Sequence, residues 1–418
     1  MRFFSLIVLA IAGAGFVEAL PTSPSGINAI RPGTVSIKQV ANPNFVRNGP
    51  VEFAKIYRKY GVALPKDLQA AVAQFHAGRV KRTSGSAETT PEANDVEYLT
   101  PVSIGTPEQV LNLDLDTGSS DLWVFSSETS KSQVKGQAVY NPNASSTAQK
   151  LQGYSWQISY GDGSSSSGDV YTDKVTVGGL VVSSQAVEVA KKVSSEFSSD
   201  ENNDGLLGLG FSSINTVEPV SQKTFFDNAM AGLDAPVFTA DLKAHTAGRY
   251  NFGYIDSKAY TGDIAYVPVD TTQGYWTFSA SGYAVGSGSF QSTTIKGIAD
   301  TGTSLLLLPS SVVSAYYGQI SGARYDSTQG GYTFPCSSSM PTLAFGVGDK
   351  NVSITIPGKY MSYAATSSMG TTCFGGVQPD TDIGFAIFGD VALKAAFVVF
   401  DGTSGKEKLG WASKQLPS

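Results

Sequence analysis

Alternation of apolar and polar residues predicts short β-strands along most of this chain, with glycine-rich turns between them. The stretch Gln109–Leu115 is a clear example, because Leu113 and Leu115 fall on one face of the predicted strand. Side chains of a strand point alternately to opposite faces, so Asp114 and Asp116 share the other face. Many such stretches, ending with the run 396–401, indicate an all-β chain after about residue 95.

Two other patterns stand out along the chain. Residues 153–168 predict a β-hairpin, because two strand-like runs flank the turn Gly161-Asp162-Gly163. An ordinary surface hairpin is the simplest interpretation of this pattern alone. Val51–Tyr60 and Lys66–Phe75 instead have the apolar spacing of helices.

One motif occurs twice in the same frame. An apolar run ends at Asp116-Thr117-Gly118-Ser119, and a second ends at Asp300-Thr301-Gly302-Thr303; each is followed by more apolar residues. A buried acid is costly unless it is hydrogen-bonded or used for chemistry. A single Asp-Thr-Gly also fits a turn closed by the aspartate side chain. Its repetition favours a matched pair of carboxylates.

The repeat extends beyond these tripeptides. Gly208 ends an apolar-apolar-Gly segment 92 residues after Asp116, and Gly389 ends another 89 residues after Asp300. A repeat of this length predicts two lobes related by a pseudo-two-fold axis, with the site where they meet. Each apolar-apolar-Gly segment is expected to pack beside its own Asp loop, since glycine permits close backbone approach.

Together with the segments 160–164, 204–210 and 387–401, these motifs span nearly the whole chain after about residue 95. The chain resembles the pepsin-like aspartic proteases, most closely the secreted fungal penicillopepsin and aspergillopepsin type. The resemblance implies a bilobal all-β fold with the active site in the cleft between the lobes. It also implies residues 86–258 as the N-terminal lobe and 259–418 as the C-terminal lobe.

The resemblance assigns the catalytic dyad to Asp116 and Asp300. Supporting roles fall on the three residues after each aspartate: the threonines bond across the lobes, the glycines lie against the carboxylates, and the hydroxyl residues donate to the outer oxygens. These residues are Thr117, Gly118, Ser119, Thr301, Gly302 and Thr303.

Substrate-binding roles follow from the same resemblance. The hairpin becomes a flap that closes over bound peptide, with Gly161 at its tip and Tyr160 paired to the Trp123 indole N–H. Phe197 and Leu206 are expected to line the pocket for the residue before the scissile bond, with Ile298 on the far side. Asp162 and Ser164 resemble the fungal pattern that accepts lysine there, although Asp162 also suits the turn alone.

The start of the chain resembles a secretory signal peptide. Arg2 precedes an apolar run from Phe3 to about Phe16, and small residues follow before residue 20. Residues 1–20 are therefore predicted to direct export, and no later stretch reaches the length of a membrane span. The mature protein is expected to be secreted and soluble. Asn143 and Asn351 head glycosylation triplets.

The two cysteines, Cys336 and Cys373, make one disulfide or two buried thiols, and export favours the bridge. The bridge would contribute about 3–4 kcal/mol to stability. The cysteines lack metal-ligand spacing, and the two histidines, His76 and His245, are far apart, so neither a metal site nor a cofactor is predicted.

Charge divides the chain in two. Residues 21–82 carry a net charge of +8, whereas residues 83–418 carry −14. A nucleic-acid-binding arm is one explanation, but a prosegment that covers an acidic cleft suits an exported protein better. Lys81-Arg82 is a candidate processing site, and the prosegment is assigned to residues 21–85. Lys59-Tyr60 resembles the lysine that the family's prosegments hold between the two aspartates; an ordinary solvated lysine is the alternative.

These patterns favour a secreted acid endopeptidase made as a zymogen. It would cleave protein and peptide substrates, with its own prosegment as inhibitor, and act as a monomer without nucleic acid or membrane partners. An inactive pepsin-like binding protein is the alternative, and a glycoside hydrolase would also use two carboxylates. A vacuolar destination stays open.

Overall fold

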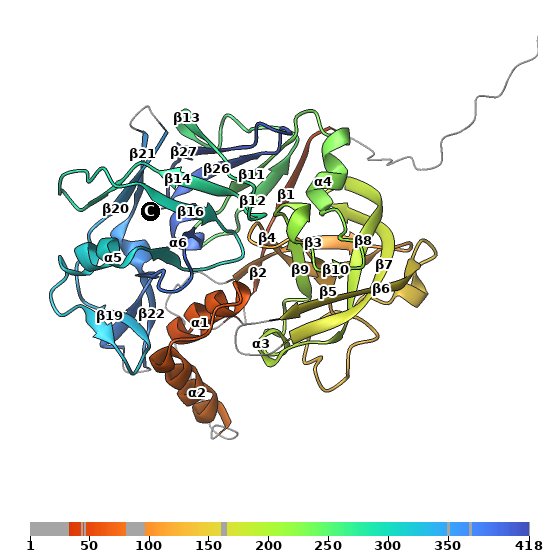
Figure 1. Cartoon of the computed structure of the whole chain (residues 1–418), viewed down its shortest axis with the longest axis horizontal. Helices are drawn as coiled ribbons and strands as arrows, with labels where there is room; N and C mark the ends of the chain where they lie inside the picture. The colour runs from red at the N-terminus through yellow and green to blue at the C-terminus, as the bar shows by residue number, and fades with distance from the viewer. Residues whose placement is uncertain are drawn as a thin grey trace, which may run out of the picture.

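The structure is a computed structural model that describes residues 33–42, 45, 47–80, 97–159, 165–348, 352–367 and 370–417. Two strand-rich lobes lie side by side, with the helix pair α1 and α2 between and below them (Figure 1). The predicted all-β, bilobal fold is confirmed. The predicted signal peptide, the Lys81-Arg82 pair, Asn351, and the hairpin tip with Tyr160, Gly161, Asp162 and Ser164 lie outside the described residues.

The first lobe contains a nine-stranded sheet in which β3 also pairs with β7. Its strands, in spatial order, are β10 (Val217–Glu218), β6 (Gln149–Ser159), β7 (Ser165–Val177), β8 (Leu180–Lys192), β5 (Leu122–Val124), β9 (Gly205–Gly208), β4 (Gln109–Asp116), β3 (Glu97–Ile104) and β2 (Val40–Asn42). The antiparallel strands β6 and β7 form the stem of the predicted hairpin. Burial alternates along β4 as expected, with Leu113 and Leu115 in the core.

The second lobe contains three smaller sheets. Their strands are β14 (Thr277–Ala280), β16 (Ile295–Ala299), β25 (Ala386–Phe388), β17 (Leu306–Leu308) and β24 (Val377–Pro379); β15 (Tyr283–Val285), β20 (Leu343–Val347) and β21 (Val352–Ile356); β18 (Arg324–Asp326), β19 (Gly331–Pro335), β23 (Thr372–Gly375) and β22 (Ser362–Ala365). A disulfide joins Cys336, just after β19, to Cys373 in β23, so the predicted bridge is confirmed.

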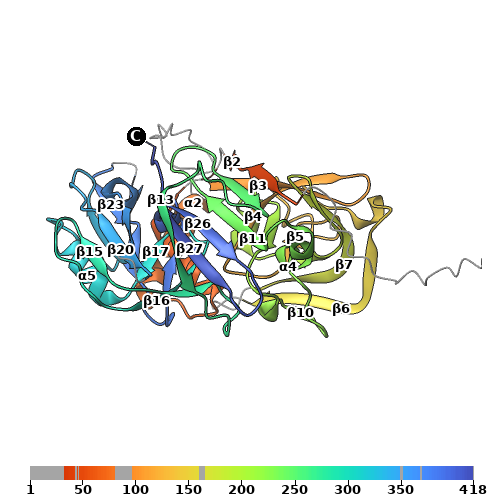
Figure 2. The same cartoon turned by 90° about the horizontal axis from the view of Figure 1, so that it is seen from above.

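A six-stranded sheet joins the two halves of the chain (Figure 2). Its strands are β1 (Val35–Lys38), β12 (Arg249–Phe252), β11 (Val237–Asp241), β26 (Ala396–Asp401), β27 (Lys408–Ser413) and β13 (Thr261–Pro268). The rings of Phe238 and Phe400 stack with centroids 4.5 Å apart on the neighbouring strands β11 and β26. The N-terminal strand β1 covers one edge of this sheet by pairing with β12.

The internal repeat is visible in the strand order around each Asp loop. In the first lobe β9 lies between β4 and β5, and in the second β25 lies between β16 and β17. Gly208 pairs with Asp116 itself, and a Cβ atom there would lie 2.6 Å from the Asp121 backbone nitrogen. Close approach of the Asp loop therefore requires glycine, as the sequence predicted.

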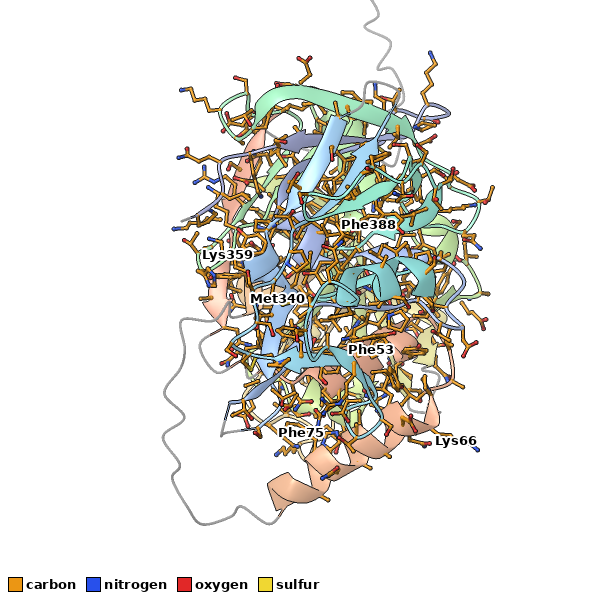
Figure 3. All side chains as sticks on the ribbon, turned by 90° about the vertical axis from the view of Figure 1, so that its left-hand side faces the viewer. Phe53, Lys66, Phe75, Met340, Lys359 and Phe388 are labelled. Atoms are coloured by element: carbon orange, nitrogen blue, oxygen red, sulfur yellow. A yellow bond between two sulfur atoms is a disulfide. The ribbon has the colours of Figure 1, made fainter. Side chains whose placement is uncertain are left out.

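The N-terminal segment contains two helices, of which α1 lies between the lobes and α2 lies below them (Figure 1). The bounds of α1 (Gly49–Lys59) and α2 (Lys66–Val80) are close to the predicted ranges. The Asn48 side chain caps α1 by accepting a hydrogen bond from the Val51 N–H at 3.0 Å. Figure 3 shows α2, with Lys66 and Phe75, lying along the edge of the molecule, whereas Phe53 of α1 lies against the body.

The remaining helical segments are short. They are α3 (Ser195–Ser198), α4 (Phe225–Ala229), α5 (Ser310–Tyr317), α6 (Asp390–Leu393) and the 3₁₀ turns η1 (Pro142–Ala144), η2 (Ser212–Ile214), η3 (Met230–Gly232) and η4 (Gly358–Met361). Across the described ranges, no helix has the length and apolar character needed to cross a membrane.

Candidate active site

The two Asp-Thr-Gly loops meet where the lobes join. Asp116 ends β4 and Asp300 follows β16, and both are fully buried. The Thr117 N–H donates to Thr301 Oγ1 at 3.1 Å, and the Thr301 N–H donates to Thr117 Oγ1 at 3.0 Å. Each threonine hydroxyl also donates to the carbonyl that precedes the opposite aspartate, at 2.8 Å to Ala299 and 2.5 Å to Leu115. The loops are therefore locked together by a reciprocal network.

Each loop supplies two hydrogen-bond donors to its own carboxylate. Gly118 N donates to Asp116 Oδ1 at 2.8 Å, and Ser119 Oγ donates to Asp116 Oδ2 at 2.6 Å. In the second loop the Gly302 N–H donates to Asp300 Oδ1 at 3.0 Å, and the Thr303 hydroxyl donates to Asp300 Oδ2. These bonds hold both carboxyl planes in fixed orientations.

The two glycines bring the carboxylates close to each other. A Cβ atom at Gly118 would lie 2.5 Å from Asp300 Oδ1, and a Cβ at Gly302 would collide with Asp116 Oδ1. Glycine is therefore required at both positions, because any side chain there would clash with the carboxylate of the opposite loop. The structure thus brings together all eight residues of the two predicted loops.

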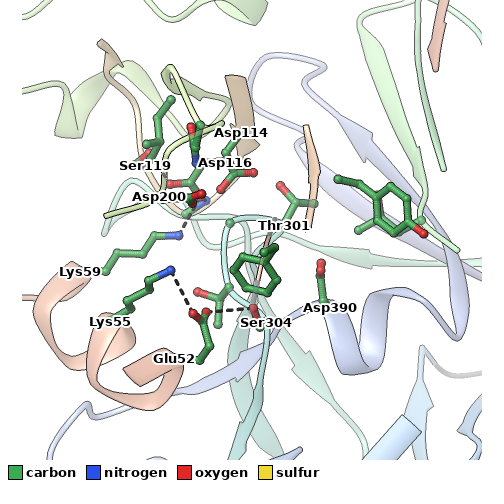
Figure 4. A pocket seen from close by; sticks show the side chains of 18 of the residues that line it. Glu52, Lys55, Lys59, Asp114, Asp116, Ser119, Asp200, Thr301, Ser304 and Asp390 are labelled. Carbon is green, nitrogen blue, oxygen red and sulfur yellow. Dashed lines mark hydrogen bonds and ion pairs between the residues drawn. The ribbon is translucent and has the colours of Figure 1, made fainter. Parts of the chain in front are cut away.

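A lysine from α1 lies between the two carboxylates. Lys59 Nζ is 2.7 Å from Asp116 Oδ1 (Figure 4). It also lies 2.8 Å and 2.9 Å from the two Asp300 oxygens. The next residue, Tyr60, donates its hydroxyl to Asp300 Oδ2 at 2.6 Å. The Lys59 side chain is 18% exposed, so it is not a freely solvated surface lysine.

Comparison with known proteins agrees with this arrangement. The family model for eukaryotic aspartyl proteases matches residues 97–414. The chain is 60% identical to endothiapepsin of Cryphonectria parasitica over 386 residues, which covers 92% of this chain and 91% of that protein. It is 50% identical to penicillopepsin-2 of Penicillium janthinellum over 99% of both chains.

The chain belongs to the eukaryotic aspartyl protease family. It is an aspartic endopeptidase, and the predicted likeness to fungal pepsins is confirmed. Among solved structures, the aspartic proteinase from Irpex lacteus matches with a TM-score of 0.62 and 25% identity, over 77% of this chain and 95% of that one.

The lysine gives the two aspartates of this aspartic protease different electrostatic environments. Burial alone raises the pKa of Asp300, but Lys59 and the hydroxyls of Thr303 and Tyr60 outweigh burial and hold the pKa below its ordinary value. Burial keeps the pKa of Asp116 above its ordinary value despite Lys59. Burial opposes the charge of Lys59, yet the two aspartates raise its pKa. The arrangement therefore favours the charged forms of Lys59 and Asp300.

Apolar and polar contacts anchor α1 of the protease against the second lobe. Phe53, Ile56 and Tyr57 share a buried cluster with the body residues Ile298, Leu305, Leu307, Phe374 and Ile387. The Tyr57 hydroxyl donates to the Thr381 carbonyl at 2.9 Å. Lys59 is therefore held in place by a whole helix.

Sequence reasoning missed one buried acid on this helix. Glu52 accepts a hydrogen bond from the Ser304 hydroxyl at 3.2 Å and pairs with Lys55 at 2.9 Å (Figure 4). Ser304 directly follows the second Asp-Thr-Gly-Thr motif. The helical position of Glu52 was predictable, but the Ser304 contact joins residues far apart in sequence and left no local signal.

A cleft of about 510 Å³ remains open beside the two aspartates. Trp123, Phe197 and Leu206 line it, and the Trp123 and Phe197 rings pack edge to face with centroids 4.9 Å apart. The Trp123 indole N–H has no acceptor among the described residues. Ile298 does not line this open space, because it is buried in the cluster beneath α1.

Two further aromatic residues of the site were not singled out from the sequence. The Tyr60 ring packs edge to face against Tyr275 at 5.6 Å and against Phe385 at 5.4 Å between centroids. Both side chains belong to the second lobe, and neither lies in a recognisable motif. Their contact with Tyr60 forms only in the folded chain, so no sequence pattern indicated it.

The remaining sequence predictions concern the surface of the protease. Asn143 is exposed within η1. His76 is exposed on α2, and His245 is exposed in the turn between β11 and β12. In the part of the chain that the structure describes, no three His, Cys, Asp or Glu side chains are grouped as a metal site would require.

Proposed function

We propose that this aspartic endopeptidase hydrolyses peptide bonds with Asp116, Asp300 and one activated water, and that it is made as a zymogen inhibited by its own prosegment. One observation carries both parts of the proposal: the two loop carboxylates face each other with the Lys59 ammonium bound between them. The lysine occupies the position that lies within hydrogen-bond distance of both aspartates. A catalytic water needs that same position.

In the active enzyme the two carboxyl groups share one proton, because two adjacent buried carboxylates resist double ionisation. The ionised carboxylate takes a proton from the water as general base. The protonated carboxyl group donates to the substrate carbonyl and stabilises the developing oxyanion. The donors Ser119 and Thr303 hold the outer oxygens, so the inner oxygens are directed at the water. No covalent intermediate is involved.

Acid provides the signal for release of the prosegment. The lowered pKa of Asp300 means that the closed precursor is stabilised above the ordinary aspartate pKa and loses this stabilisation as pH falls. Protonation of the acidic body also weakens its attraction for the basic segment 21–82. The inhibited form therefore opens in acid.

The proposal also covers maturation. Residues 1–20 direct export to the extracellular space. Processing near Lys81-Arg82, which leaves a start within residues 83–90, separates the prosegment, assigned to residues 21–85, from the body. The mature enzyme acts as a monomer with lobes 86–258 and 259–418. Asn143 is exposed and open to glycosylation.

For specificity, we infer a preference for large apolar residues, and for lysine, before the scissile bond. The aromatic and aliphatic lining from Phe197 and Leu206 suits an apolar side chain. A carboxylate at Asp162 would pair with a substrate lysine. Matched peptides with phenylalanine, lysine or aspartate at this position test the inference: both phenylalanine and lysine peptides should be cleaved, and the aspartate peptide should not.

The main experiment compares the full-length protein with its Asp300→Asn variant. Hydrolysis of a denatured protein is followed at acid and at neutral pH, before and after acid treatment. We expect activity only after acid exposure, and a loss of at least about 10³-fold in the variant, since one member of a catalytic unit is removed. Equal activity in the variant would contradict the dyad, and full activity without acid exposure would contradict the inhibited precursor.

A further inference from the structure

A second pair of buried carboxyl groups lies behind the active-site loop. Asp121 follows Asp116 by five residues and is 3% exposed, and Glu188 on β8 is 1% exposed. Glu188 is in register with Trp123, which lines the cleft. Within the described residues, no lysine, arginine or histidine pairs with either carboxyl group. Two buried carboxylates without a cation are energetically unfavourable, so this pair requires a physical explanation.

The hydrogen bonds around the pair leave one fully buried oxygen without a donor. Asn215 Nδ2 is 2.9 Å from both Asp121 Oδ1 and Glu188 Oε1, and the Thr216 N–H donates to Asp121 Oδ1 at 2.8 Å. Glu188 Oε2 is buried and has no donor in the described chain. The two carboxyl side chains lie within hydrogen-bond contact of each other. A proton on one of them would supply the missing donor and remove one negative charge.

The second lobe provides an internal comparison. Counted from each catalytic aspartate, Leu305 corresponds to Asp121 and Leu307 corresponds to Trp123. Glu188 pairs with Trp123 in parallel register, and in the same way Gln378 pairs with Leu307. The second lobe thus carries an apolar residue and an amide where the first lobe carries two acids.

The amide of Gln378 is fully satisfied. Its Oε1 accepts from the Tyr332 N–H at 2.8 Å, and its Nε2 donates to the Gly375 and Tyr332 carbonyls at 2.8 Å and 3.1 Å. The repeated architecture therefore accepts glutamine at this position. The carboxyl pair is a specific feature of the first lobe and is not imposed by the fold.

We propose that Asp121 and Glu188 share one proton in a direct carboxyl–carboxylate hydrogen bond, and that this proton positions the active-site loop. Asn215 links the pair to the loop backbone, because its Nδ2 also lies 3.2 Å from the Ser120 carbonyl oxygen. The Asp121 carbonyl in turn accepts from the Gly208 N–H at 2.9 Å. The shared proton thus connects β8, the loop and the strand that supports Asp116.

Few other ionisable groups face the pair. Asp116 is the charged neighbour along the loop. On β7, Val170 is in register with Glu188, so the flanking Asp169 and Tyr171 point to the opposite side, where they meet Lys191, Lys150 and Glu128. Glu218 on β10 and Lys223 before α4 are exposed, and Asp227 of α4 accepts from Ser212. Burial and mutual repulsion raise the pKa of Glu188 well above its ordinary value.

The shared proton makes the folded state sensitive to pH. Above the ordinary glutamate pKa, the unfolded chain loses a proton that the folded chain keeps. Stability is therefore fully present in acid and falls as pH rises toward the raised folded pKa. One retained proton increases the unfolding equilibrium constant about tenfold per pH unit over this range.

Infrared spectroscopy of the full-length protein tests the proton directly. At pH 6.5 we expect a carbonyl band of a protonated carboxylic acid that moves when the protein is labelled with ¹³C-glutamate. Asp116 and Asp300 are aspartates, so labelled glutamate would not move a band that arises from them. The measurement therefore tests the Asp121–Glu188 pair independently of the proposed catalytic dyad. If no band depends on labelled glutamate, the proton could still reside on Asp121; in that case ¹³C-aspartate labelling should move a band that the Asp121→Asn variant lacks. Absence of both bands would overturn the proposal.

Glu188→Gln provides the second test, because the amide copies the protonated acid at every pH. Urea unfolding between pH 5 and 7.5 should show that the variant matches wild type at the acid end and is more stable at the neutral end. The slope of the unfolding free energy against pH should correspond to one proton fewer than in the wild type. Glu218→Gln, at an exposed glutamate, should leave the slope unchanged. An unchanged slope in Glu188→Gln would overturn the proposal. If that variant does not fold, the labelling experiment decides.

Discussion

At the scale of single residues, the site depends on donors that are local to each aspartate. The residues after Asp116 and Asp300 supply a backbone N–H and a hydroxyl to the carboxylate that precedes them. Hydrogen bonds to the ionised form lower a carboxyl pKa, and burial raises it. The balance between these two effects sets where Asp116 and Asp300 titrate.

Replacement of Ser119 by alanine tests this balance. Loss of the 2.6 Å bond to Asp116 Oδ2 should raise the pKa of Asp116, so the acidic limb of the pH–rate profile should move to higher pH by about one unit. The rate below that limb should fall about tenfold or more. The profile is measured on the mature enzyme, with Ser289→Ala, an exposed serine, as control. An unmoved limb would show that Ser119 does not tune the dyad.

At the scale of elements, the repeated strand arrangement fixes the distance between the loops. The strands β9 and β25 each separate the two strands of an Asp loop, and glycines at the contacts allow the backbones to touch. The reciprocal threonine bonds then join the loops across the lobes. The geometry of the two aspartates is thus a property of two supersecondary units and not of the aspartates alone.

Gly302→Ala should disturb this geometry directly. The added methyl group would collide with Asp116 Oδ1. We expect a loss of activity of more than about 100-fold and a destabilisation of about 1–3 kcal/mol from overpacking. Gly318→Ala is the matched control, because Gly318 caps α5 with φ −60° and an added Cβ there would approach only backbone carbonyls of its own helix, the nearest being that of Ser314 at 3.0 Å. Activity and urea midpoints near wild type for Gly302→Ala would contradict the steric argument.

At the scale of the whole molecule, two kinds of contact hold the N-terminal segment in the cleft. The ammonium of Lys59 is bound by both aspartates, and the apolar face of α1 is buried against the second lobe. The strand β1 adds a third attachment at the edge of the six-stranded sheet. Acid weakens only the electrostatic contacts, so under the zymogen proposal the segment is expected to loosen first and then to be separated from the body by cleavage.

Lys59→Ala should weaken the closed precursor at neutral pH. Its removal leaves two buried carboxylates without a cation, which costs about 3–5 kcal/mol. We expect a lower unfolding midpoint at pH 7 and activation that begins at higher pH, because the pKa of Asp300 is no longer held down. Denaturation and activation assays on the full-length protein check both effects. Lys66→Ala, at an exposed position of α2, is the control. If Lys59→Ala were activated at the same pH as wild type, Lys59 would not be what holds the precursor closed.

Local patterns in the sequence were sufficient for much of this molecule. The duplicated Asp-Thr-Gly frame predicted two lobes and a paired site, because each copy is an apolar strand ending at an acid. In the structure the strand order around the two loops is equivalent. Helical spacing placed the two N-terminal helices near their observed ranges. Two cysteines allow only one intramolecular bridge, and the structure contains it. The place of Lys59 was expected only through resemblance to a family.

Tertiary structure alone decided the contacts that join distant parts of the chain. Glu52 meets Ser304 across 252 residues, and Glu188 meets Asp121 behind the active-site loop. The sheet shared by β1, β11 and β26 also brings together strands from both ends of the chain. These contacts carry no local pattern, because a charged or polar residue gains a buried partner only after the strands between them have packed. Their energies depend on burial and distance, which the folded chain sets.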